Sequence, residues 1–136
     1  MANELDAKLQ KAVTSIPECV AAGFVDLASG MVLSIKTVDS HPQEVFDLLA
    51  AATADIFQGP NVKSIEQVFR RARGLPENSD HHYFQEIIVN SDNLIHVFLR
   101  GKRQMQVACF VCRKGANLGM VLTKSRMALP EIEAAL

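Results

Sequence analysis

The segment Gln43–Gln58 constrains the fold most, because it predicts a helix with an unusually wide apolar surface. At about 100° per residue its apolar side chains cover roughly 200° of the helical wheel, against about 100° for an ordinary surface helix. They are Val45, Phe46, Leu48, Leu49, Ala50, Ala52, Ile56 and Phe57. An exposed apolar patch of that breadth usually marks an interaction site. We therefore expect this helix to pack on its own sheet and also on a second copy of the chain.

Length and composition predict a single domain spanning residues 1–136. The chain has 136 residues and 49% hydrophobic content, which suits one core. The amino terminus lacks the basic and apolar regions of a signal peptide, and no run reaches the ~18 apolar residues of a membrane span. Cys19, Cys109 and Cys112 are odd in number and scattered, so we expect reduced, partly buried thiols. These features predict a cytoplasmic protein that does not insert into membranes.

Charge is divided unevenly along the chain. Residues 1–68 carry four basic and nine acidic residues, whereas residues 69–136 carry ten basic and six acidic ones. The basic residues that could contact an anionic partner are Arg70, Arg71, Arg73, Arg100, Lys102, Arg103, Arg113 and Lys114. They fall at a predicted helix end and in turns, with no aromatic residues between them. We therefore predict solvated charge and no nucleic-acid binding.

Hydrophobic periodicity and turn residues predict the remaining elements. A first helix follows Asn3 and ends at Pro17, and residues 62–72 form another that should pack over a sheet edge. Asn117 caps a closing helix, and Pro130 opens its last turn. The predicted strands are Cys19–Leu27, Met31–Lys36, Tyr83–Asn90, Leu94–Arg100 and Met105–Cys112. This order predicts an α+β domain with helices on both faces of one antiparallel sheet.

The candidate metal ligands do not form a convincing site. Cys109 and Cys112 have C-x-x-C spacing, but residues three apart in a strand point to opposite faces, and no second pair of ligands follows. Asp80, His81 and His82 are adjacent on a predicted loop and lack distant partners. We therefore predict no metal and no cofactor.

Catalytic patterns are also missing from the sequence. His96 lies in a predicted strand among apolar residues and is interpreted as a half-buried structural histidine. Ser29 sits in a hairpin turn without the context of a nucleophile. The segment Gly115–Gly119 precedes a helix but lacks the Lys and Ser/Thr pair of a nucleotide-binding loop. The sequence therefore predicts no catalytic residues and no enzyme.

The element order, the hairpin Gly23–Leu33 and the junction Ala116-Asn117-Leu118-Gly119-Met120 resemble the roadblock family. That family includes dynein light chains of the roadblock type and bacterial regulators of Ras-like GTPases. The resemblance covers nearly the whole chain, although the segment Gly59–His82 is longer than the usual link and adds a helix. It implies a roadblock/profilin-like α+β fold. In this fold a five-stranded antiparallel sheet has the broad helix on one face and the first and last helices on the other.

The resemblance also implies a homodimer, in which the broad helix and the third strand meet their two-fold mates and form a ten-stranded sheet. The predicted interface residues are Val45, Leu48, Leu49, Ala52, Ile56, Phe84, Glu86 and Ile88. The implied function is a non-catalytic module that binds and regulates a small Ras-like GTPase. Its predicted partner-binding strip is Glu44, Asp47, Ala51 and Asp55. The alternatives are a dimeric scaffold without effect on a nucleotide cycle and a small-ligand sensor with an apolar pocket.

Overall fold

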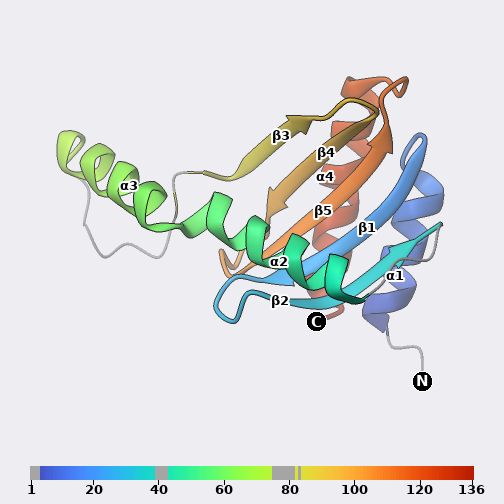
Figure 1. The fold of residues 1–136 in the computed structure, drawn as a ribbon, viewed down its shortest axis with the longest axis horizontal. Helices are drawn as coiled ribbons and strands as arrows, with labels where there is room; N and C mark the ends of the chain where they lie inside the picture. The colour runs from blue at the N-terminus through green and yellow to red at the C-terminus, as the bar shows by residue number, and fades with distance from the viewer. Residues whose placement is uncertain (1–3, 39–42, 75–81, 83) are drawn as a thin grey trace.

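The computed structural model describes residues 4–38, 43–74, 82 and 84–136, and for residues 43–47 it describes the backbone only. The elements in these residues follow the predicted order (Figure 1). They are α1 (Glu4–Ser15), β1 (Cys19–Asp26), β2 (Met31–Thr37), α2 (Gln43–Gln58), α3 (Pro60–Ala72), β3 (Glu86–Asn90), β4 (Leu94–Arg100), β5 (Gln106–Arg113) and α4 (Leu118–Ala134).

The five strands form one antiparallel sheet in the order β2-β1-β5-β4-β3. The β1–β2 hairpin reverses at Gly30, whose φ of 69° is accessible to glycine without strain. Ser29 lies in the same turn and donates from its hydroxyl to Asp26 at 2.8 Å, which is a structural use of this serine. The strands β2 and β3 are the two sheet edges, so among the described residues β3 has a neighbouring strand on one side only.

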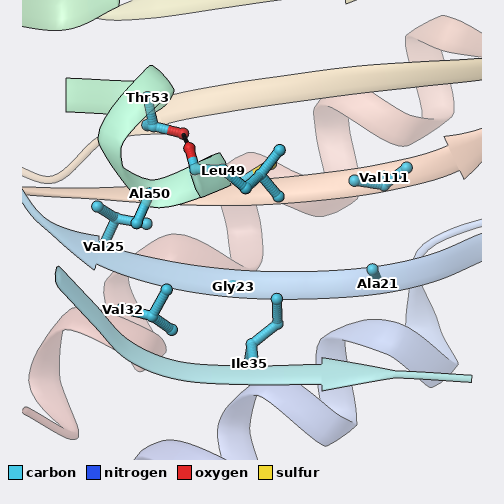
Figure 2. Close-up of a pocket in the computed structure, with 10 residues that line it drawn as sticks. Ala21, Gly23, Val25, Val32, Ile35, Leu49, Ala50, Thr53 and Val111 are labelled. Carbon is cyan, nitrogen blue, oxygen red and sulfur yellow. Dashed lines mark hydrogen bonds between the residues drawn. The ribbon is translucent and has the colours of Figure 1, made fainter. Parts of the chain in front are cut away.

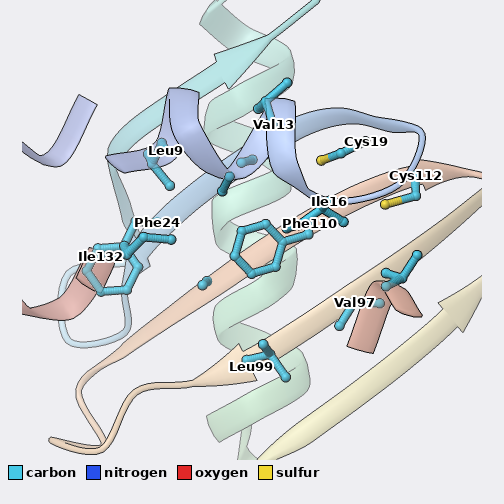
Figure 3. Packing of buried hydrophobic residues seen from close by; sticks show 14 of the residues in the cluster. Leu9, Val13, Ile16, Cys19, Phe24, Val97, Leu99, Phe110, Cys112 and Ile132 are labelled. Atoms are coloured by element: carbon cyan, nitrogen blue, oxygen red, sulfur yellow. The ribbon is translucent and has the colours of Figure 1, made fainter. Parts of the chain in front are cut away.

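Helices cover both faces of the sheet, as predicted. On one face, α1 and α4 enclose a core that includes the fully buried Leu9, Phe24, Phe110 and Ile132 (Figure 3). On the other face, Phe57 of α2 packs edge-on against Phe98 of β4, with ring centroids 6.3 Å apart. The predicted fold, a five-stranded antiparallel sheet between two helical layers, is confirmed.

Strand alternation assigns side chains to the two cores. In β4, Ile95 and Val97 face α1 and α4, whereas Phe98 faces α2. The two cysteines of the C-x-x-C segment divide in the same way, with Cys112 in the first core and Cys109 in the second. The prediction that they point to opposite faces is therefore confirmed.

Two predicted boundaries are wrong. The strand β3 begins at Glu86, and the Phe84 carbonyl before it accepts from the Arg100 side chain. Tyr83 lies outside the described residues. Pro130 does not open a separate turn, because α4 continues through it to Ala134. Burial of Ile132 and Glu133 fixes the turn that follows the proline.

The cap of α4 can be tested by substitution. The Asn117 side chain accepts a hydrogen bond from the Met120 amide at 3.0 Å, as its position in the sequence predicts. We expect Asn117→Ala to lower the free energy of unfolding by about 1 kcal/mol, because that amide loses its acceptor. Urea denaturation measures the difference. Asn117→Asp restores the acceptor and should recover most of the loss.

Candidate dimer and partner interface

One side of α2 packs on the sheet. Ala50, Thr53 and Phe57 are almost fully buried. The Thr53 hydroxyl donates to the Leu49 carbonyl at 2.8 Å, which satisfies this buried polar group within the helix (Figure 2). The helix packs mainly against β1 and β2. This contact accounts for only part of the wide apolar arc.

A second apolar flank of α2 is left uncovered in the single chain. Leu48 is 65% exposed and Leu49 37% exposed, Ala52 is exposed, and Ile56 is half-buried. On the wheel these four residues fall within roughly 100°, directly beside the buried side. Val45 shares this flank by spacing, but its side chain lies outside the described part of the structure. The flank is therefore a continuous apolar surface that the sheet of the same chain does not cover.

The sheet face beside this flank is also open. Val89 of β3 is 39% exposed, and Leu94 and His96 of β4 are half-buried on the face that carries α2. The His96 ring stacks on Phe98 with centroids 6.4 Å apart, and burial lowers its pKa. His96 is therefore a half-buried histidine that is neutral at pH 7, which agrees with the structural role predicted for it.

The edge strand β3 is tied to α4 by one ion pair. Arg126 donates to both carboxylate oxygens of Glu86, at 2.7 and 3.0 Å, and these hydrogen bonds lower the pKa of Glu86. Ile88 lies on the same side of the strand and is 40% exposed, whereas Phe84 is half-buried ahead of the strand. Of the three residues predicted on this edge, Glu86 and Ile88 therefore lie in β3 and Phe84 does not.

The buried Arg100 joins α2, the segment just before β3 and the β4–β5 turn. Its guanidinium donates to three carbonyl oxygens: Phe57 at 3.0 Å, Phe84 at 2.9 Å and Gln104 at 3.1 Å. It also lies 5.1 Å from the centre of the Phe57 ring. The prediction of a solvated turn charge is wrong for this residue, because Arg100 is only 4% exposed. Two of its acceptors, Phe57 and Phe84, are distant in sequence, so no local pattern identifies them.

The helix α3 buries a polar side chain and exposes its apolar ones, which is the reverse of the expected arrangement. Its carboxylate Glu66 is 2% exposed and lies 3.2 Å from His82 Nδ1, whereas Ile65, Val68 and Phe69 are exposed. The helix extends away from the sheet beyond α2 (Figure 1). The prediction that α3 packs over a sheet edge through its apolar face is therefore wrong. The buried contact of α3 is the polar one between Glu66 and His82, near Arg100, and not the apolar contact that was expected.

The predicted partner-binding strip is described in part. Ala51 and Asp55 are exposed on α2, away from its buried side. Glu44 and Asp47 follow at helical spacing, but their side chains lie outside the described residues. The same applies to Asp80 and His81 of the predicted loop cluster. Among the residues that the structure describes, no group of three potential metal ligands is present.

Two cavities bear on ligand binding. The apolar one, between α2 and the strands β1, β2 and β5, has a volume of about 30 Å³ (Figure 2). This is room for little more than water and far below the ~300–1,000 Å³ of small-molecule sites. A hollow of about 360 Å³ lies between the β4–β5 turn and α4. There Glu133 accepts from the Lys102 and Arg103 amides, both at 3.0 Å.

No family model and no curated protein matches the chain, but solved structures do. MglB of Myxococcus xanthus has a TM-score of 0.69 at 15% identity, over 96% of this chain and 92% of that one. A roadblock/LC7 domain of Streptomyces avermitilis has a TM-score of 0.67 at 15% identity, over 97% of both chains. The chain has the roadblock fold.

A further MglB, the gliding protein of Thermus thermophilus, has a TM-score of 0.69 at 17% identity and covers 99% of this chain and 93% of its own. The likeness to these roadblock-fold chains confirms the fold that the hairpin and the Asn-Leu-Gly junction imply. The helices in the described part of the chain are all too short or too polar to cross a membrane.

Proposed function

We propose that this chain is a non-catalytic homodimeric module that binds and regulates a small Ras-like GTPase in the cytoplasm. Two observations carry the proposal, in a chain with the roadblock fold: the uncovered apolar flank of α2 and the position of β3 at an edge of the sheet. The family that this fold resembles includes regulators of Ras-like GTPases. We extend this regulatory activity to the present chain as part of the proposal.

The dimer forms by joining two β3 edges and two α2 flanks about a two-fold axis. Pairing of β3 with its mate satisfies the unpaired main-chain groups of the edge and gives a continuous ten-stranded sheet. A two-fold contact uses the same patch twice, so Leu49, Ala52 and Ile56 meet their own copies. Each subunit would also help to cover the open face over Val89 and His96 of the other.

The proposed partner surface lies beside this seam. Asp55 is exposed there, and Glu44 and Asp47 would extend its negative charge along α2. A dimer without a catalytic set of its own can change a nucleotide cycle by holding the switch loops of the GTPase in one arrangement. Complementary charge would favour encounter with a basic patch on that partner.

Partner capture in two nucleotide states tests the function. The tagged chain is incubated with lysate of its source organism containing a non-hydrolysable GTP analogue or GDP, and the retained proteins are identified by mass spectrometry. We expect one Ras-like GTPase, retained several-fold better in one nucleotide state. A set of partners that is the same in both states would contradict regulation and favour the scaffold.

Charge reversal tests the strip. We expect Asp47→Lys combined with Asp55→Lys to reduce GTPase capture at least about tenfold, the effect of ~1.4 kcal/mol of lost binding energy. The dimer should stay intact, since Asp55 lies outside the apolar flank. Glu4→Lys, an exposed reversal on α1 across the sheet, is the matched control. Equal capture by both proteins would remove the strip from the interface.

One observation favours the scaffold as a second candidate. The helix α3 presents Ile65, Val68 and Phe69 to solvent, and an apolar surface of this kind suits a further protein contact. The ligand-sensor alternative has no comparable support, because the apolar cavity under α2 holds only about 30 Å³.

A further inference from the structure

Two of the three cysteines lie opposite each other on neighbouring strands. The sheet register pairs Cys19 of β1 with Cys112 of β5. Both side chains enter the core beneath α1 and α4 (Figure 3). The register shifts between Cys19 and Ala21, so this pair stands at an irregularity of the ladder. The hydrogen bond between the two thiols places the sulfur atoms next to each other.

The two thiols have different chemical characters. A hydrogen bond with the Cys112 thiol lowers the pKa of Cys19, although burial opposes the shift, and the same contact raises the pKa of Cys112. Cys19 is 7% exposed at the start of its strand, whereas Cys112 is completely buried. Because Cys19 is the more exposed of the two thiols, an oxidant from solvent reaches it first, and Cys112 is the thiol that follows.

We propose that Cys19 and Cys112 are a peroxide-reactive thiol pair that closes to an intrachain disulfide. The Cys19 thiolate attacks one oxygen of hydrogen peroxide and breaks the O–O bond, which gives a sulfenic acid and hydroxide. The Cys112 sulfur then attacks the Cys19 sulfur, and the sulfenic oxygen leaves as water with the released protons. Overall, two thiols are oxidised to one disulfide, and one peroxide is reduced to two molecules of water.

Cys109 serves as an internal control. It occupies β5 three residues before Cys112 but faces the core beneath α2, on the other side of the sheet. Burial raises its pKa to about 12. Cys109 is therefore expected to stay reduced while the pair reacts.

Oxidation of the reduced wild-type chain tests the proposal. After treatment with hydrogen peroxide, we expect the intact mass to fall by about 2 Da, the mass of two hydrogens. Peptide mapping without reductant should identify a bond between Cys19 and Cys112, and dithiothreitol should reverse it. The oxidised chain should also melt at a temperature several degrees higher, because the bond restricts the unfolded chain.

Variants separate the two steps. Cys109→Ser should form the bond at an unchanged rate. Cys112→Ser should stop at the sulfenic acid on Cys19, which dimedone labels, and Cys19→Ser should resist the same dose of peroxide. Three intact thiols in wild type at a dose that fully oxidises free glutathione would overturn the proposal. Over-oxidised Cys19 without the disulfide in wild type would overturn it as well, and neither result depends on how a variant folds.

Discussion

Arg100→Met is expected to lower the free energy of unfolding by about 3–5 kcal/mol, because it breaks a buried ionic junction. The guanidinium supplies hydrogen bonds to three carbonyl groups from three different segments of the chain. Burial lowers the pKa of Arg100, and the carboxylate of the buried Glu66 opposes that shift. Methionine fills similar space but leaves the carbonyls and this carboxylate without the cation.

Chemical denaturation followed by circular dichroism measures the loss. Arg113→Met is the matched control, since Arg113 is exposed at the end of β5, and it should change the stability by less than about 0.5 kcal/mol. Arg100→Lys should recover only part of the stability, because one ammonium cannot reproduce the fork geometry. If Arg100→Met unfolds at the same denaturant concentration as wild type, Arg100 does not hold the junction together.

Leu49→Asp is expected to convert the proposed dimer to a folded monomer, with a dissociation constant at least about a hundredfold higher. Leu49 is 37% exposed in the single chain, so a carboxylate there can remain partly hydrated in the monomer. In the proposed dimer, the new carboxylates of the two subunits would lie close to each other and away from water. Sedimentation velocity measures the change, and circular dichroism verifies the fold.

Leu33→Asp provides a control of equal exposure. Leu33 is 38% exposed but lies on β2, at the edge of the sheet opposite β3. We expect this variant to remain a dimer. A folded Leu49→Asp protein with the mass of the wild-type assembly would show that α2 does not form the seam.

The parts of the fold that depend on local patterns could be predicted from the sequence. The bounds of α2 match because Gly59-Pro60 ends the helix, and β4 matches because apolar residues alternate between two cores. The Asn117 cap is likewise a contact between near neighbours. The wide apolar arc of α2 indicated that one sheet could not cover it, and the structure leaves Leu48 and Leu49 exposed.

The predictions that were wrong concern residues whose contacts join distant segments of the chain. Arg100 has the spacing of an ordinary turn residue, yet Phe57 and Phe84 bring carbonyl groups to it from far along the chain. The apolar periodicity of α3 predicted a helix but not which of its faces is buried. The buried face carries Glu66, which contacts the distant His82. Of the candidate site, the sequence pattern predicted the wide apolar surface of α2 and the family resemblance implied the β3 edge, but neither indicated the polar junction around Arg100.

The homodimer is the claim on which the proposed function depends, and the mass of the wild-type chain in solution tests it most directly. Sedimentation equilibrium of the reduced protein should give twice the chain mass of 14.9 kDa at micromolar concentration. A mass of 14.9 kDa at every concentration up to the millimolar range would contradict the account, since the apolar flank of α2 would then have no second copy to cover it.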